Sequence, residues 1–377
     1  MVAARGGICA TAALAIFALA MVPPIEAKAG DVTVTIVAPL SGAMIGGSSG
    51  YETGMRLAVE AINDAGGLLG RQLRMTVVDD ACDPDQAEVA AEQALADQPL
   101  VIIGHFCSEG AIRAATVYAR AGVIAISPTA TSPHLTEMGV STVFRMVGRD
   151  DRQGLTAARA LAQHWSQRRI AIFDDGAAYS RGLADIVRDQ LRKRGIAPVV
   201  DGHFTPNALN YDPVIQTLRK QHVEVLYAAG HALDVGLILR EIAAAALTVQ
   251  VLGPDTLNVS DLQDVAGSAT EGLLFTYPPD PMRMPSAQPM LSAAKSHGEH
   301  LERRTLLTYA ALQVWAEAVK RSGSFAAPVV AATLRGAPLD TILGPVSFDA
   351  KGDIVGPLSD WIWYRWHQGT TAPGTPR

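Results

Sequence analysis

The segment 101–135 contains a strand–helix–strand unit in which both strands end in small hydroxyl residues. The predicted strands, Val101–Gly104 and Gly122–Ile126, are short and apolar, and one helix length of chain separates them. The turns that follow are Cys107–Gly110 and Ser127–Ser132. Strands joined by a helical crossover lie parallel. The unit therefore predicts an α/β fold with a parallel sheet.

These hydroxyl-rich turns predict a site for a small anion. Ligands of parallel α/β sheets bind beyond the carboxyl ends of the strands, and the free N–H groups at a helix N-terminus attract negative charge. The turns have neither the lysine of a phosphate loop nor a Gly-x-Gly-x-x-Gly pattern. A small carboxylate therefore suits this edge better than a nucleotide does.

Strand and helix patterns alternate along the rest of the chain, with a break near residue 148 and another near 278. This rhythm predicts two βα blocks that form two similar lobes with a ligand site between them. The segment Pro278–Pro289 carries five prolines. We expect no regular structure in it.

The N-terminal residues have the pattern of a secretory signal peptide. Arg5 precedes the apolar run Ala10–Val22, and Ala27–Ala29 matches a cleavage site. We expect residues 1–29 to be removed and the mature chain to begin at Gly30; the alternative is an uncleaved anchor. Cys9 lies before the apolar run, so a lipid anchor is not expected.

Removing the leader leaves two cysteines, Cys82 and Cys107, each just past a predicted strand. In an oxidising compartment they can pair, closing a loop of about 25 residues and contributing roughly 3 kcal/mol of stability. The alternative is two buried free thiols. The formal net charge of −6 provides no basic surface for nucleic acid.

Several motifs resemble those of the periplasmic branched-chain amino-acid-binding proteins, in order and over essentially the whole mature chain. The matching segments are Asp79–Pro84, Ile103–Ser108, Thr129–Pro133, Gln153–Gly154, Tyr179–Ala184, Gly253–Asp255, Glu271–Leu274 and Thr308–Gln313. The resemblance implies a type I periplasmic binding fold, with two Rossmann-like lobes and hinge crossings near 149, 278 and 357. The N-terminal lobe would then comprise 30–149 and 279–356, and the C-terminal lobe 150–278 and 357–377.

The resemblance also implies a function without catalysis or cofactor. A monomeric receptor in the periplasm would capture an amino acid, with leucine, isoleucine or valine the first expectation, and deliver it to an ABC permease of the inner membrane. Lobe closure would trap the ligand. It further implies that Cys82 and Cys107 form a disulfide.

Five ligand contacts carry over by resemblance. The α-carboxylate would be held by Ser108 and Thr131, and the α-ammonium by the backbone carbonyl of Thr129 and by Asp255. Tyr179 would pack on the ligand from across the site. A zwitterion needs donors at one end and acceptors at the other, because a desolvated charge without a partner is costly. The alternatives are purely structural roles: helix capping by Ser108, Thr131 and Asp255, and side-chain packing by Tyr179.

The chain departs from the family at its specificity positions. Gly46–Ser48 stands where well-known members have a tyrosine, and His231 where a tyrosine closes over the ammonium. Asp255 is one methylene shorter than the usual glutamate. Arg304 lies near a position where the family places an aromatic or apolar wall. We expect it to form a surface salt bridge with Glu299 or Glu302; the alternative is contact with a polar or acidic ligand side chain.

Two other function classes stay open. One is a receptor that senses an amide, urea or another small polar molecule. The other is a secreted hydrolase, because Gly46–Gly50 matches the Gly-x-Ser-x-Gly elbow around Ser48, although that elbow requires a strand ending directly at the serine. His297 and His300 have weak metal spacing, and we expect His105 to be a packed, hydrogen-bonded residue.

Overall fold

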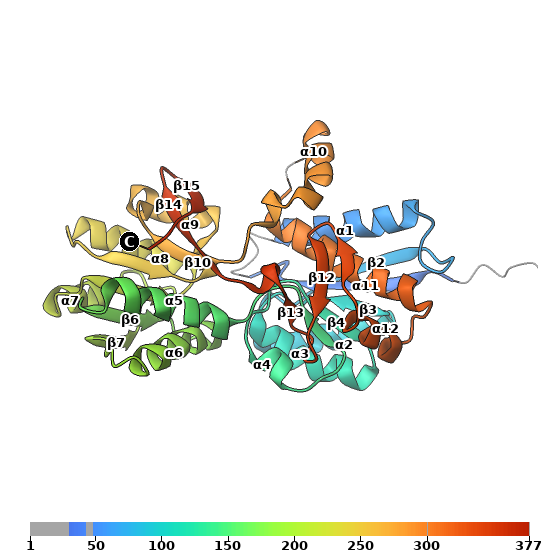
Figure 1. Cartoon of the computed structure of the whole chain (residues 1–377), viewed down its shortest axis with the longest axis horizontal. Helices are drawn as coiled ribbons and strands as arrows, with labels where there is room; N and C mark the ends of the chain where they lie inside the picture. Colours follow the sequence, from blue (N-terminus) through green and yellow to red (C-terminus); the bar gives the residue numbers. More distant parts are fainter. Residues whose placement is uncertain (1–29, 43–47, 300, 377) are drawn as a thin grey trace, which may run out of the picture.

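The computed structural model describes residues 30–42, 48–299 and 301–376. They form two lobes that lie side by side along the long axis of the molecule (Figure 1). We call the part built around the first sheet the first lobe and the part built around the second sheet the second lobe. The predicted leader 1–29 and the first-loop residues Gly46 and Gly47 lie outside the described residues.

The first lobe contains a five-stranded parallel sheet in the order β2-β1-β3-β4-β5. The strands are β1 (Val32–Ala38), β2 (Leu73–Asp79), β3 (Val101–Ile103), β4 (Ile124–Ser127) and β5 (Val143–Arg145). Its helices are α1 (Ser48–Asp64), α2 (Pro84–Ala96), α3 (Ser108–Ala121), α4 (His134–Glu137), α10 (Gln288–Ser296), α11 (Arg303–Ser322) and α12 (Ala327–Leu334). A small antiparallel sheet, β11 (Leu339–Thr341), β12 (Gly344–Phe348) and β13 (Ile354–Val355), completes it.

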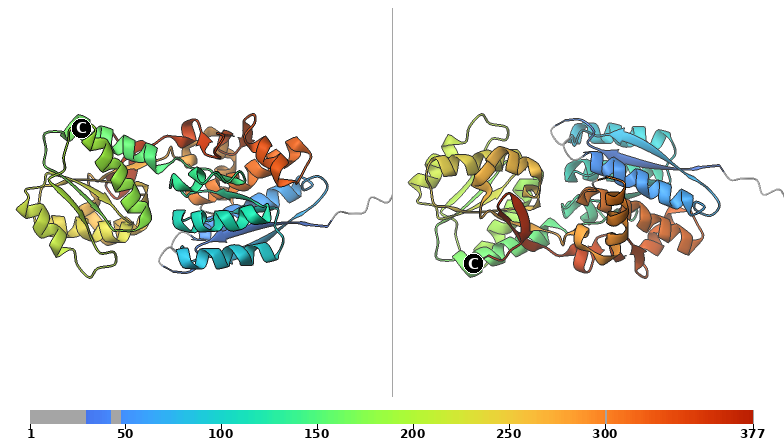
Figure 2. Two further views of the ribbon diagram at one scale, coloured as in Figure 1. Left: turned by 90° about the horizontal axis from the view of Figure 1, so that it is seen from below. Right: turned by 90° about the horizontal axis from the view of Figure 1, so that it is seen from above.

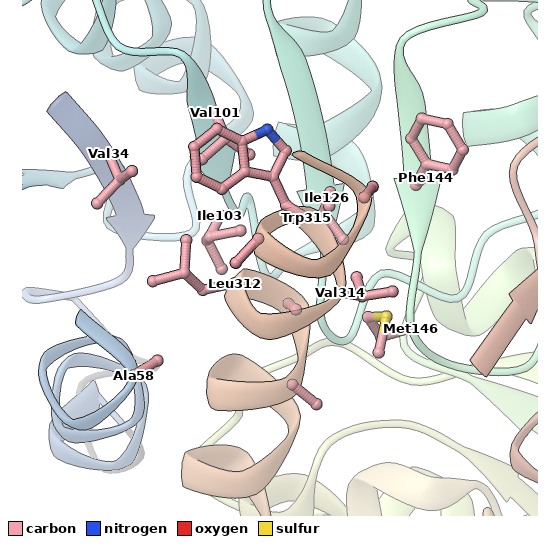
Figure 3. Packing of buried hydrophobic residues seen from close by; sticks show 14 of the residues in the cluster. Val34, Ala58, Val101, Ile103, Ile126, Phe144, Met146, Leu312, Val314 and Trp315 are labelled. Atoms are coloured by element: carbon pink, nitrogen blue, oxygen red, sulfur yellow. The ribbon is translucent and has the colours of Figure 1, made fainter. Parts of the chain in front are cut away.

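Alternation along the strands explains why helices cover both faces of this sheet. Val101 and Ile103 pack into the same core cluster as α1 and α11, whereas Ile102 faces the small residues of α2 and α3. The largest fully buried side chain is Trp315 of α11. Figure 3 shows its indole directed toward the strands that carry Val101 and Ile126.

The second lobe contains a seven-stranded sheet in the order β15-β14-β10-β9-β8-β6-β7. Its strands are β6 (Ile170–Asp174), β7 (Val200–His203), β8 (Val225–Ala229), β9 (Gln250–Gly253), β10 (Leu274–Tyr277), β14 (Ile362–His367) and β15 (Thr370–Pro373). The first five are parallel, and the last two are added antiparallel. Its helices are α5 (Asp150–Trp165), α6 (Ala178–Arg192), α7 (Asp212–Lys220), α8 (Ala232–Ala244) and α9 (Ser260–Ala266), on both faces (Figure 2).

The chain passes between the lobes at three places: from β5 to α5, after β10, and from β13 to β14. The α/β prediction is confirmed. The expectation for Pro278–Pro289 is wrong in part, because this segment holds two short 3₁₀ turns and the start of α10. Pro281, Pro285 and Pro289 stand in the first positions of their turn or helix, where the missing N–H costs nothing, whereas Pro278 and Pro279 precede the first turn. Among the described residues, no helix is long and apolar enough to cross a membrane.

Candidate functional site

The turns after β3 and β4 meet as the sequence predicts. Cys82 and Cys107 form a disulfide with Cα atoms 5.6 Å apart, which ties the turn after β3 to the end of β2. Ser108 is the first residue of α3, and its Oγ accepts hydrogen bonds from the N–H groups of Thr131 and Ser132, both at 3.2 Å. The N-cap is Cys107, so Ser108 does not cap α3. Its hydroxyl proton stays available for an acceptor in the site.

The two threonines have different surroundings. Thr129 Oγ1 donates to the carbonyl oxygen of Phe106 at 2.9 Å, and the Tyr51 hydroxyl is also bonded to this side chain. Thr131 is buried, and its carbonyl accepts from the N–H of Asp150 at 3.0 Å. Among the described residues, no hydrogen bond reaches the carbonyl oxygen of Thr129. This free acceptor is the group for which the resemblance predicts contact with an ammonium.

The second lobe contributes a carboxylate held by two donors. Asp255 follows β9, and its Oδ1 accepts from the Tyr179 hydroxyl at 2.6 Å and from Nε2 of Gln153 at 2.9 Å. The same Gln153 nitrogen also donates to Thr276 Oγ1 at 3.0 Å. Burial raises the pKa of Asp255, although these hydrogen bonds favour the carboxylate. An ammonium ion at Asp255 would supply the missing counter-charge.

His231 forms a second charged pair beside Tyr179. Its Nδ1 lies 3.0 Å from Oδ2 of Asp175, and its ring centroid is 6.0 Å from that of Tyr179. Burial by itself lowers the pKa of His231, but the hydrogen bond and the charge of Asp175 outweigh burial, so the pKa is raised. Tyr179, His231 and Asp255 therefore share one edge of the second sheet.

The two lobes meet at this site. The carboxyl group of Asp150, the first residue of α5, bonds to the Thr131 side chain and lies near the Asp255 carboxylate. Further along, the Glu109 carboxylate accepts from the N–H of Ala178, the first residue of α6, at 3.2 Å. The six predicted contact residues thus line the carboxyl edges of two facing sheets. Their contacts with a ligand stay predictions.

Asp150 is a site residue that the sequence reasoning missed. It is 3% exposed, and burial together with the charge of Asp255 raises its pKa to about 8. Its Oδ1 has no hydrogen-bond partner in the part of the chain that the structure describes. Two neighbouring buried atoms also lack partners among the described residues: Gln153 Oε1 and the Tyr227 hydroxyl. The only signal in the sequence was the position of Asp150 at the predicted crossing.

Replacing Asp150 with asparagine is expected to stabilise the protein in a pH-dependent way. Because burial raises its pKa, the folded state holds a proton that the unfolded chain releases, and the free energy of unfolding falls between about pH 4 and 8. Asparagine removes this loss. We expect Tm to rise by about 2 °C or more at pH 8 and to change little at pH 4.5. Thermal unfolding at both pH values is the measurement, and an equal shift at both would contradict the assignment.

Two tyrosines and two arginines lie beside these site residues: Tyr51, Tyr277, Arg303 and Arg304. Neither tyrosine was predicted from the sequence. The Tyr51 ring packs on Phe106 with centroids 3.5 Å apart, and Arg304 Cζ lies 5.5 Å from the Tyr51 centroid. Arg303 lies over Tyr277 at 4.5 Å. The expected salt bridge of Arg304 is wrong, because neither Glu299 nor Glu302 lies within ion-pair distance in the described part of the chain. The packing of α11 on α1 directs Arg304 to Tyr51 instead.

The remaining candidate motifs have structural explanations. Ser48 is the first residue of α1, and β1 ends at Ala38, so the strand does not run directly into a serine elbow. His105 is fully buried, with Nδ1 2.6 Å from Asp80 and Nε2 2.8 Å from the Tyr118 hydroxyl, as expected for a packed residue. No cluster of metal-binding side chains occurs among the described residues, which exclude His300.

A family model described as "Periplasmic binding protein" matches residues 31–369. The Leu/Ile/Val/Thr-binding protein of Salmonella typhimurium is 35% identical over 347 residues, which cover 92% of this chain and 94% of that protein. The Leu/Ile/Val-binding protein of Escherichia coli is 33% identical with the same coverage. The chain belongs to the branched-chain amino-acid-binding family of periplasmic binding proteins.

Solved structures place this binding protein in the type I fold. A leucine-binding protein of Thermotoga maritima superposes with a TM-score of 0.81 at 21% identity, covering 91% of this chain and 98% of that one. An ABC transporter substrate-binding protein of Desulfitobacterium hafniense, solved in complex with Leu, gives 0.74 at 25% identity, covering 91% and 99%. A Rhodopseudomonas palustris solute-binding protein solved with benzoate gives 0.78 at 19% identity, covering 92% and 96%. The fold prediction is confirmed.

Proposed function

We propose that this protein is a receptor for an L-α-amino acid and delivers it to an ABC permease. The observation that carries the proposal is the opposition of two kinds of group across one site. Ser108 and the free N–H groups at the start of α3 face an anion, whereas Asp255 and the carbonyl of Thr129 face a cation. A zwitterion is the small ligand that satisfies both ends at once.

Capture would proceed by lobe closure. The ligand docks on Ser108, Thr129 and Thr131, and the second lobe then rotates about the crossings near 149, 278 and 357 to bring Tyr179, His231 and Asp255 onto it. The lobes in this proposal are 30–149 with 279–356, and 150–278 with 357–377. Closure is favoured only by contacts that the closed state alone makes. The contact between Glu109 and the start of α6 supports such a state.

The proposal places the receptor in the periplasm as a monomer without catalytic activity. The leader pattern of residues 1–29 supports export, and a disulfide suits an oxidising compartment. The permease would recognise a surface to which both lobes contribute. The printed names of the relatives make branched-chain amino acids the first ligands to try.

A ligand screen tests the proposal. The purified mature protein is heated with amino acids, amides, urea and short aliphatic acids, and hits are measured by calorimetry. A bound ligand raises Tm by mass action. We expect an α-amino acid among the hits; binding of amides or urea alone, with no amino acid, would overturn the proposal.

Replacing Ser108 with alanine is expected to lower the affinity for the tightest-binding amino acid by about tenfold or more, because a hydrogen bond to a charged group contributes about 1.5–3 kcal/mol. The matched control is Ser166→Ala at the exposed end of α5. Calorimetric titration of both variants is the measurement. Equal affinities for the two would exclude Ser108 from the carboxylate contact.

A further inference from the structure

Arg304 is a cation at the site for which the proposed amino-acid function has no use. It lies on the first turn of α11, with its Cζ 5.5 Å from the ring centroid of Tyr51. The hydroxyl of that tyrosine forms a hydrogen bond with the Thr129 side chain. The charge of Arg304 also acts on Tyr277, where it lowers the pKa that burial and the charge of Asp255 raise. Arg304 therefore lies over the ring of Tyr51 and within electrostatic range of Tyr277.

The neighbouring arginine shows what a structural role looks like here. Arg303 lies over Tyr277 at 4.5 Å, and its Nε is 3.0 Å from Oδ1 of Asp280. Arg304 lies over Tyr51 in a similar way but has no acidic partner among the described residues. The five N–H donors of a guanidinium lie in the plane of that group. When the guanidinium lies over an aromatic ring, these donors can still form hydrogen bonds with other acceptors.

The nearby acids all have other partners. Asp175 pairs with His231, the Glu109 carboxylate binds the start of α6, and the Glu302 side chain forms the capping box of α11 with Thr305. Asp255 is the acceptor for the ligand ammonium in the proposed function.

Asp150, the remaining acid, is kept neutral near pH 7 by its surroundings, because burial raises its pKa to about 8. The α-carboxylate is met by neutral donors at Ser108 and α3. Among the described residues, Arg304 therefore has no acidic side chain as an ion-pair partner. A ligand with a second negative group would supply that partner.

We infer that Arg304 selects amino acids with a carboxylate side chain, so that the receptor prefers L-glutamate or L-aspartate to L-leucine. The inference rests on the proposed function, since it assumes that the zwitterion lies between Ser108 and Asp255. The guanidinium offers a carboxylate two parallel hydrogen bonds, which a branched aliphatic side chain cannot use. A leucine side chain would instead displace water from the Arg304 guanidinium without offering it a hydrogen-bond acceptor.

Calorimetric titration of L-glutamate, L-aspartate and L-leucine tests the inference. In the unchanged protein, at least one acidic amino acid is expected to bind about tenfold or more tightly than leucine. Arg304→Leu is expected to reverse that order, whereas Arg304→Lys keeps the charge and should retain the preference in weaker form. The acidic ligand should also lose affinity as salt rises, more steeply than leucine does.

The matched control is Arg56→Leu, which removes the same charge from an exposed position of α1. It should leave all three affinities unchanged. If leucine binds as tightly as both acids and Arg304→Leu leaves the ratios within about twofold, the inference is overturned while the proposed function stands. If none of the three ligands binds and no other amino acid does so in the screen, the proposed function fails and the inference fails with it.

Discussion

Replacing Asp255 with alanine is expected to weaken amino-acid binding about 100-fold or more, the largest effect of any single change in the site. The change removes the only carboxylate proposed for the α-ammonium. It also leaves the Tyr179 hydroxyl and the Gln153 amide without their shared acceptor. A charge desolvated without its partner costs several kcal/mol, so the loss should appear mainly as faster dissociation. Calorimetry gives the affinity, and stopped-flow fluorescence gives the dissociation rate.

Two further variants separate charge from hydrogen bonding at this position. Asp255→Asn keeps an acceptor for Tyr179 and removes only the charge, so its affinity should lie between those of the alanine variant and the unchanged protein. Asp261→Ala removes an exposed aspartate from α9 and should leave affinity unchanged. An affinity of Asp255→Ala within about threefold of that of the unchanged protein would show that the ammonium lies elsewhere.

Replacing Asp353 with alanine is expected to lower the free energy of unfolding by about 3–5 kcal/mol, because it leaves a buried arginine without its counter-charge. Arg145, at the end of β5, is 0% exposed, and its Nε lies 2.5 Å from Oδ1 of Asp353. Arg149 binds the other carboxylate oxygen at 2.9 Å. Urea unfolding followed by tryptophan fluorescence measures the change.

The exposed Asp340 of β11 provides the control, since Asp340→Ala removes the same group and should shift the unfolding midpoint very little. Arg145 also donates to the carbonyls of Ala130 and Ser132, which flank Thr131. We therefore expect Asp353→Ala to weaken ligand binding as well. A variant with unchanged stability would show that water or another group compensates Arg145.

The sequence predicts the lobes' sheets well because their strands are buried on both faces and read as short apolar runs. Val101–Ile103 and Ile124–Ser127 match the expected strands to within two residues at each end. The strands β11 and β12 have no such signal, since β11 is only 3 residues long and β12 contains Pro345. The helix α10 was hidden by Pro289 near its start and by the prolines that precede it.

The sequence predicted the site residues that follow the ends of strands, but not those brought to the site by packing between helices or between lobes. Ser108, Thr131 and Asp255 lie in or just after the turns that follow β3, β4 and β9, so their place at the carboxyl edge follows from the α/β pattern. Tyr51 and Arg304 lie on helices whose mutual packing brings together residues about 250 positions apart, and no local pattern encodes that contact. The burial of Asp150 likewise depends on how the two lobes meet.

The chain enters the second lobe before the first lobe is complete, and this order constrains how the protein is made. The strand β1 and the helix α11 share one core, yet the ribosome synthesises every strand from β6 to β10 between them. The second sheet in turn receives β14 and β15 last. Neither lobe can bury its full core until the final part of the chain has emerged. A nascent chain should therefore stay partly open and sensitive to proteases throughout its synthesis, and removal of the last strands should harm the whole molecule.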